Sequence, residues 1–151
     1  MNVRRARVAD VPALAAIAEA SYGSAFRDIL EPEVLRSRDA AFFAERFAAS
    51  WARMLVALAG ERPVGFLLMS DGHVDMLFMD PASAGRGGGA LLLRRAEQNG
   101  ARSLECFRDN HAARRFYERQ GWRVAREYER DFAGRTRSFV LYAKADSERI
   151  A

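Results

Sequence analysis

The chain has 151 residues, of which 50% are hydrophobic and 29% are charged. This balance is typical of a globular protein, so we expect one domain over residues 1–151 and exclude an intrinsically disordered chain. No apolar run is long enough to cross a bilayer, and the N-terminus lacks the apolar stretch of a signal peptide. With one cysteine, Cys106, no internal disulfide can form. We therefore expect a cytoplasmic protein with no membrane partner.

The formal net charge of +4 comes almost entirely from arginine, since Lys144 is the only lysine. The arginines are spread along the chain, whereas nucleic-acid-binding proteins concentrate their cations on one face beside stacking aromatic residues. We interpret most of them as solvated surface residues and do not expect nucleic acid as a partner. An anionic, phosphate-bearing cofactor remains compatible with this charge.

The chain begins with a predicted strand over Val3–Arg7. Asp10 then offers an N-cap for a helix whose apolar residues recur at helical spacing as far as Tyr22. We expect Gly23 to end that helix, because glycine is a poor helix former.

An amphipathic helical region and three strands follow in the first half of the chain. The helical region is marked by four aromatic residues at helical spacing: Phe42, Phe43, Phe47 and Trp51. Short tight turns then separate strands predicted at 54–59, 64–69 and 73–79, which should form an antiparallel meander.

After residue 80 helices and strands alternate. Pro81 stops the preceding strand, a glycine cluster follows, and helical spacing resumes over 90–98. Beyond it we expect a strand at 103–107, a helix capped by Asn110, and strands at 122–132 and 136–143. The element order predicts one α/β (α+β) domain.

The segment 74–89 places a strand, a glycine-rich turn and the start of a helix in immediate succession. Glycines let backbone N–H groups converge on an anion, and a helix N-terminus adds a favourable dipole, so this loop suits a pyrophosphate. No Gly-Lys-Ser/Thr follows, which disfavours a Walker A loop, and the strand belongs to a meander rather than to a dinucleotide fold. Alone, a glycine-rich turn is a weak signal, and a plain structural loop is the alternative.

A second segment resembles a family motif. Residues 110–122, Asn-His-Ala-Ala-Arg-Arg-Phe-Tyr-Glu-Arg-Gln-Gly-Trp, resemble the Asn-x-x-Ala-x-x-Phe-Tyr-x-x-x-Gly-Phe motif of the GNAT N-acetyltransferase superfamily. The glycine loop resembles that family's Gln/Arg-x-x-Gly-x-Gly/Ala motif, with Gly87 and Gly89 at the glycine positions. The first position of the motif, normally Gln or Arg, is occupied by Ala84. We expect this replacement to alter the phosphate contacts rather than to abolish binding. Arg86 remains to pair with phosphate.

The resemblance implies a mixed, mostly antiparallel sheet of about seven strands flanked by about four helices and splayed between the fourth and fifth strands. It implies an enzyme that transfers the acetyl group of acetyl-CoA to a primary amine by direct attack in a ternary complex, without a metal. The acceptor would be a small-molecule or peptide amine, and a homodimer is compatible with the family. A non-catalytic acyl-CoA-binding regulatory module is the alternative.

The resemblance also assigns the cofactor contacts. The main chain of Leu77, Phe78 and Met79 should contact the pantetheine arm, where the family's fourth strand is bulged. Asn110 should hydrogen-bond the pantetheine, and it also fits the N-cap of its helix. The pyrophosphate should be received by the amides of the loop and helix start: Gly85, Arg86, Gly87, Gly88, Gly89 and Ala90.

For catalysis, Tyr117 matches the family's general acid, which protonates the departing thiolate of coenzyme A. The alternative is that Phe116 and Tyr117 form an aromatic core pair. His73 and Asp75 are two apart on one strand, hence on one face, at positions where relatives carry a catalytic Glu or His. His73 also fits a surface histidine beside a turn, Asp75 also fits a binder of the cationic acceptor, and water could relay the proton.

Two further expectations concern the remaining site residues. Cys106 fits a buried small hydrophobe rather than a nucleophile, because no Cys-His-Asn pattern accompanies it. The acceptor should bind between the first helices and the last strands, with Tyr22 and Phe26 as wall residues. Leu30 and Trp51 are further candidates, although helical spacing favours the core for Trp51.

Overall fold

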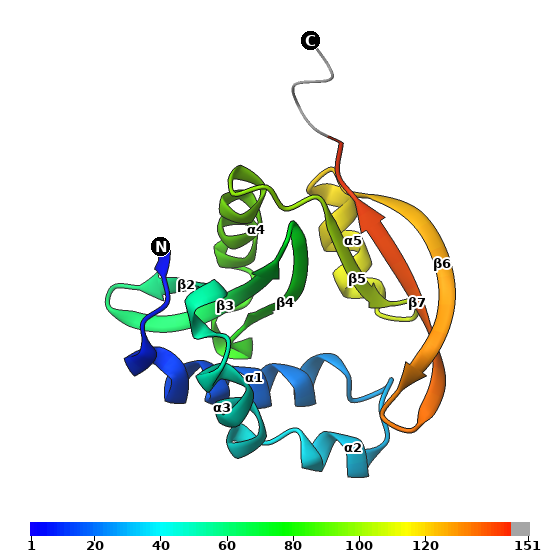
Figure 1. Ribbon diagram of the computed structural model, residues 1–151, viewed down its shortest axis with the longest axis horizontal. Coiled ribbons are helices and arrows are strands. Elements are labelled where there is room, and N and C mark those ends of the chain that lie inside the picture. The colour runs from blue at the N-terminus through cyan, green and yellow to red at the C-terminus, as the bar shows by residue number, and fades with distance from the viewer. Residues whose placement is uncertain (146–151) are drawn as a thin grey trace.

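A computed structural model describes residues 1–145 of the chain, with seven strands and five α-helices in that range (Figure 1). The strands are β1 (Asn2–Arg5), β2 (Met54–Ala59), β3 (Arg62–Ser70), β4 (His73–Met79), β5 (Ser103–Phe107), β6 (Arg123–Phe132) and β7 (Arg135–Ala143). The α-helices are α1 (Val11–Ala25), α2 (Pro32–Ser37), α3 (Ala40–Ala48), α4 (Gly88–Gln98) and α5 (His111–Arg119). Short 3-10 turns are η1 (Val8–Asp10), η2 (Trp51–Arg53) and η3 (Pro81–Ser83).

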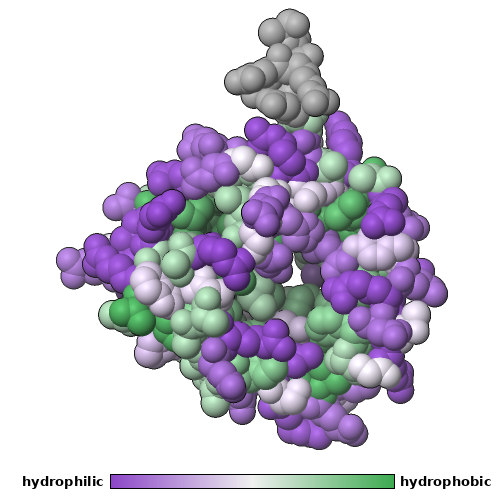
Figure 2. Space-filling view, viewed as in Figure 1, coloured by the Kyte–Doolittle hydropathy of each residue, from purple (hydrophilic) through white to green (hydrophobic). Residues whose placement is uncertain are grey.

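The strands form one sheet in the order β1-β2-β3-β4-β5-β7-β6. Neighbouring strands are antiparallel except β4 and β5, which are parallel and paired only at His73 with Ser103 and at Val74 with Leu104. Beyond these pairs the two strands diverge (Figure 1), and the surface is hollowed near the centre of the same view (Figure 2). The predicted mixed sheet, splayed between its fourth and fifth strands, is confirmed.

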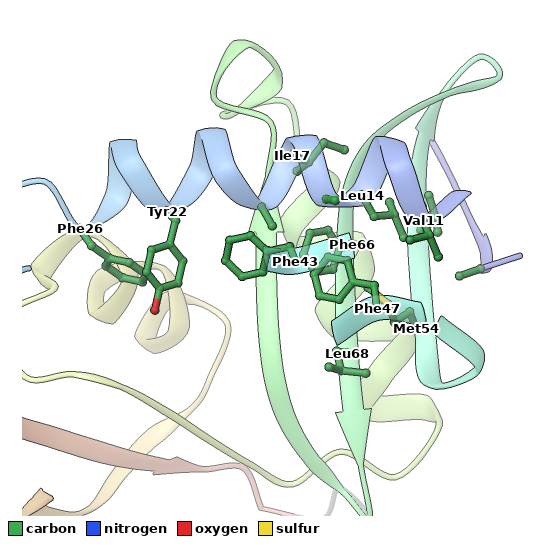
Figure 3. Packing of buried hydrophobic residues seen from close by; sticks show 14 of the residues in the cluster. Val11, Leu14, Ile17, Tyr22, Phe26, Phe43, Phe47, Met54, Phe66 and Leu68 are labelled. Atoms are coloured by element: carbon green, nitrogen blue, oxygen red, sulfur yellow. The ribbon is translucent and has the colours of Figure 1, made fainter. Parts of the chain in front are cut away.

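Apolar side chains pack against both faces of the sheet. On one face α1 and α3 bury a cluster that includes Leu14, Phe43, Phe47 and Phe66 (Figure 3). On the other face residues of α4 and α5 pack around the fully buried Trp122. Burying each large apolar side chain contributes about 1.5–3 kcal/mol, so these two cores hold the helices on the sheet.

The first helix departs from the predicted bounds. Asp10 does not cap α1: its carboxylate accepts hydrogen bonds from the Arg7 N–H and from both terminal nitrogens of Arg4. Gly23 does not end the helix, which continues to Ala25. A glycine inside a helix costs about 1 kcal/mol, and burial of Tyr22 on the same turn offsets this cost.

Within residues 1–145, no helix combines the length and the apolar character needed to cross a lipid bilayer.

Candidate active site

The divergence of β4 and β5 opens a cleft of about 620 Å³. Its lining runs from Ala84 in the glycine loop, along β4, to β5 and α5, and continues to the side covered by α1. Where two parallel strands separate, the hydrogen bonds between them are absent. Main-chain and side-chain atoms of both strands then face the space between them. The cleft therefore connects the two faces of the sheet, with the glycine loop at one end and an aromatic wall at the other.

The glycine loop places main-chain donors beside this cleft. Gly85 and Gly87 have φ angles of +81° and +88°, a region that favours glycine. The first hydrogen bond within α4 runs from the Leu91 N–H to the Gly87 carbonyl, and no side chain caps the helix. The N–H groups of its first residues, Gly88 to Ala90, thus lie at the positive end of the helix dipole, where they can bind an anion. Arg86 is exposed next to them.

The β4 residues expected to meet the pantetheine arm, Leu77, Phe78 and Met79, all line the cleft. The Met79 carbonyl already accepts a hydrogen bond of 2.6 Å from the Ser21 hydroxyl of α1. This bond ties α1 to the strand and leaves the main-chain atoms of the neighbouring residues as the better candidates for ligand contacts.

Asn110 caps α5 and lines the cleft. Its Oδ1 accepts a hydrogen bond of 3.2 Å from the Ala113 N–H. The cap uses only the oxygen, so the side-chain NH₂ can still donate to a ligand. The expected structural role is therefore present, and it is compatible with cofactor contact.

Tyr117 is buried, and it also lines the cleft. Its ring lies 5.4 Å from that of Phe116 and 5.8 Å from that of Tyr142, measured between centroids. The pKa of the phenol is raised well above its ordinary value, mainly by burial and to a smaller extent by the neighbouring Cys106 and Tyr142. Tyr117 thus belongs to an aromatic cluster and lines the cleft, and its phenol keeps its proton at neutral pH.

Cys106 lines the same space. Burial raises the pKa of its thiol to about 12. Because the thiolate is the nucleophilic form, a thiol held protonated at neutral pH is a poor nucleophile. This agrees with the expectation that Cys106 acts as a small hydrophobe.

The two candidate bases are separated by a β-bulge. The register of β3 and β4 shifts so that Asp75 is the extra residue on β4, which interrupts the alternation that would place it on one face with His73. Asp75 is exposed, lines the cleft and accepts a hydrogen bond of 2.6 Å from Ser70. His73 lies at the closed end, 2.8 Å from the Ser103 hydroxyl, and is not among the residues that line the cleft.

Glu105 was missed by the sequence analysis. It is half-buried on β5, lines the cleft and accepts hydrogen bonds from the Tyr128 hydroxyl and from Arg130, whose Nε lies 3.0 Å away. Burial alone would raise the pKa of Glu105, but the bonds from Arg130 and Tyr128 outweigh it and hold the pKa below its ordinary value. A lone acidic residue inside the short apolar strand at 103–107 was the available signal.

Tyr22 and Phe26, which the sequence predicts as walls of the acceptor site, both line the cleft on the α1 side. Four further aromatic side chains, not anticipated, complete this wall: Phe78, Phe107, Phe132 and Phe139. Leu30 and Trp51 pack into the hydrophobic core instead.

Residues 20–139 match a family model described as acetyltransferase (GNAT) domain. The chain is also similar to the peptidyl-lysine N-acetyltransferase YjaB of Escherichia coli strain K12, at 34% identity over 76 residues. That alignment covers 50% of this chain and 52% of YjaB, so it spans about half the length of the curated relative.

The structural comparisons cover nearly the whole chain. The solution structure of apo YjaB from Escherichia coli superposes with a TM-score of 0.78 and 27% identity, over 97% of this chain and 98% of that one. Two structures below 25% identity share the fold. One is the PaiA N-acetyltransferase of Thermoplasma acidophilum in complex with coenzyme A, with a TM-score of 0.74 and 20% identity. The superposition covers 95% of this chain and 98% of that one.

The other is YncA of Salmonella typhimurium with acetyl-CoA, with a TM-score of 0.66, 22% identity, and coverage of 97% of this chain and 94% of that one. The family model spans well over half of the chain, and the splayed sheet, the glycine loop and the Asn110 helix are all present. The chain therefore belongs to the GNAT family of acetyltransferases.

Proposed function

We propose that this protein transfers the acetyl group of acetyl-CoA to a primary amine by direct attack within a ternary complex. The observation that carries the proposal is the continuous cleft that connects the glycine loop, Tyr117 and the aromatic wall. One end offers main-chain donors to a diphosphate, and the other offers apolar walls and carboxylates to an amine. Structures of PaiA with coenzyme A and of YncA with acetyl-CoA support the choice of donor, and the description of YjaB supports an amine acceptor.

We assign the diphosphate of the donor to the amides of the loop and helix start, residues 85–90, with Arg86 as an additional charge partner. The pantetheine arm would pass along Leu77, Phe78 and Met79 and meet the side-chain NH₂ of Asn110. The thioester would then lie between β4 and β5, beside Tyr117, because the three β4 residues, Asn110 and Tyr117 all line the same cleft.

In the proposed reaction the neutral amine attacks the thioester carbon, and a tetrahedral oxyanion forms. A main-chain N–H of the bulged β4 can stabilise this oxyanion. The C–S bond then breaks, the thiolate takes the proton of Tyr117, and the amide nitrogen loses its extra proton. We assign the uptake of each proton that the acceptor loses to Asp75, directly or through water, and Asp75 releases each one to solvent, from which Tyr117 regains its proton. His73 would need a water relay, since it does not line the cleft.

Two measurements on the purified full chain test this proposal. Calorimetry with coenzyme A and acetyl-CoA should show binding, and a screen of amine pools should show acceptor-dependent thiol release from acetyl-CoA. Binding without turnover of any amine would instead favour the non-catalytic acyl-CoA-binding module. Absence of binding to both coenzyme A and its acetyl ester would overturn both functions.

A further inference from the structure

The charged side chains that line the cleft are few. Among the described residues the lining holds two carboxylates, Asp75 and Glu105, and one guanidinium, Arg130. Together they leave a single negative charge. Asp75 lies on β4 and Glu105 on β5, the two strands that diverge, whereas Arg130 lies on the edge strand β6.

Arg130 is held against Glu105 by more than one contact. Its guanidinium forms two hydrogen bonds with the Glu105 carboxylate, and it lies 4.2 Å from the ring centroid of Phe139 and 5.6 Å from that of Phe132. Stacking on two rings limits the rotation of the guanidinium. Arg130 therefore neutralises Glu105 in place.

The rest of the lining on the α1 side is mostly aromatic, with Ser21 and Ser24 of α1 as neutral polar residues. Rings of α1, β4, β5, β6 and β7 contribute to it, and neighbouring rings touch, as Phe26 and Phe107 do at 5.1 Å between centroids.

In such surroundings an ammonium group is stabilised by the ring faces and by the carboxylate of Asp75. This carboxylate forms no direct ion pair within residues 1–145, but it accepts a hydrogen bond from Ser70, whose hydroxyl accepts one from Arg53. A second charge on the acceptor would lose its hydration without a partner, which is unfavourable.

We propose that Arg130 sets acceptor specificity: by cancelling Glu105 it leaves one negative charge in an aromatic cleft, which selects a primary amine carrying a single charge on an apolar stem. This inference rests on the proposed acetyltransferase function. Diamines, polyamines and zwitterionic amino acids are disfavoured acceptors, since each brings a second charge into the cleft. The same chemistry is offered by a free alkylamine or arylalkylamine and by a lysine side chain in a neutral peptide.

The test compares acceptors that differ by one charge. Pentylamine and 1,5-diaminopentane have the same carbon chain, and the kcat/KM for thiol release with acetyl-CoA is measured for each. We expect pentylamine to be favoured by at least about tenfold, after allowance for the two amino groups of the diamine, because an unpaired charge in an apolar site costs about 1.4 kcal/mol or more. A neutral lysine derivative, N-acetyl-lysine N-methylamide, is the third acceptor, and its kcat/KM relative to pentylamine tells whether the stem comes from a peptide or from a free amine.

Variants assign the selectivity to Arg130. Arg130→Gln should leave two negative charges and shift the pentylamine-to-diaminopentane ratio by at least about tenfold toward the diamine, whereas Arg130→Lys should retain most of the preference. Arg123→Gln removes an exposed arginine from the same strand, and so changes the net charge equally; it should leave the ratio unchanged. Calorimetry with coenzyme A, expected to be unaltered, shows that each variant is folded.

The outcomes separate this inference from the proposed function. Equal or better use of the diamine by the wild type, or an unchanged ratio in Arg130→Gln, would overturn the assignment to Arg130 while leaving an acetyltransferase. Thiol release with none of the acceptors, including those of the amine pools, would overturn both.

Discussion

Burial sets the protonation of the two titratable side chains that flank the proposed thioester position. The pKa of Cys106 is raised to about 12, and that of Tyr117 is also raised. At neutral pH both groups keep their protons. For the thiol this removes nucleophilicity, whereas for the phenol it preserves the proton that a departing thiolate needs.

At the residue scale, Tyr117→Phe should lower kcat by about 100-fold or more, the usual contribution of a general acid. The dissociation constant of acetyl-CoA should stay near the wild-type value, because the ring that packs in the core is retained. Steady-state thiol release and calorimetry measure the two quantities. Tyr142→Phe is the control, since this neighbouring buried hydroxyl bonds Arg114 and Glu118 and does not line the cleft. A wild-type kcat for Tyr117→Phe would reject the acid role.

The second residue-scale prediction concerns Gly87, whose φ is +88° and whose added Cβ would meet no atom within 4 Å. Alanine there is strained by about 1–2 kcal/mol, and relaxation of the loop should turn its N–H groups away from the diphosphate. We expect Gly87→Ala to weaken coenzyme A binding about tenfold, corresponding to 1.4 kcal/mol.

The matched control is Gly134→Ala in the turn between β6 and β7, where φ is +81° and the space is equally open. Both variants should lose similar stability in urea unfolding, but only Gly87→Ala should change the dissociation constant measured by calorimetry. Equal affinities in the two variants would argue against a diphosphate at the loop.

At the scale of the elements, local pattern predicts bounds well where turns flank a short strand. The strands expected at 54–59, 73–79 and 103–107 are β2, β4 and β5 with those bounds. The predicted start cap and end of α1 were wrong because contacts with other residues outweigh the local preference. Arg4 draws the Asp10 carboxylate away from the start of α1, and packing of Tyr22 carries the helix through Gly23.

The Arg4–Asp10 contact predicts a pH-dependent stability. The hydrogen bond from Arg4, reinforced by the Arg7 N–H, outweighs burial and lowers the pKa of Asp10. A lowered pKa stabilises the fold above the ordinary value of about 4, and this stabilisation is lost as the pH falls through the lower folded value. Asp10→Asn should therefore cost about 1–3 kcal/mol of unfolding free energy at pH 7.

Urea unfolding of the wild type and of Asp10→Asn at pH 7 and at pH 2–3 measures this effect, and the difference between them should shrink at the acidic pH. Asp28 is exposed in the connection from α1 to α2, so Asp28→Asn should have the same free energy of unfolding as the wild type at both pH values. A difference that persists unchanged in acid would show that the charge of Asp10 does not carry the stabilisation.

At the scale of the whole molecule, the splayed sheet joins two halves by only two paired positions between β4 and β5. A second link crosses the acceptor side, where Glu31, between α1 and α2, contacts Arg137 at 2.8 Å and Arg135 at 3.1 Å on β7. A donor seated in the cleft would contact both halves at once, so its binding should stabilise the complete fold.

We expect coenzyme A at about 100 times its dissociation constant to raise the free energy of unfolding by about 2.7 kcal/mol and the melting temperature by roughly 5–10 °C. Thermal melts with and without the ligand measure the shift. For Gly87→Ala, the same concentration of coenzyme A should give a smaller increase in melting temperature. Pantetheine, which lacks the diphosphate, should raise the melting temperature of the wild type only slightly at that concentration. A melting temperature that coenzyme A leaves unchanged would contradict donor binding in the cleft.

The local sequence by itself determined the order of the strands and most helices along the chain, the bounds of β2, β4 and β5, the glycine loop and the Asn110 helix, because alternation, turn residues and caps act over a few residues. Only the tertiary structure decided which charged side chains meet on the acceptor side. The sheet order β5-β7-β6 brings Arg130 to Glu105, 25 residues away, and a one-residue bulge takes Asp75 out of alternation with His73. Strand order and register depend on how the whole sheet packs, so no local pattern specifies which charges meet in the cleft.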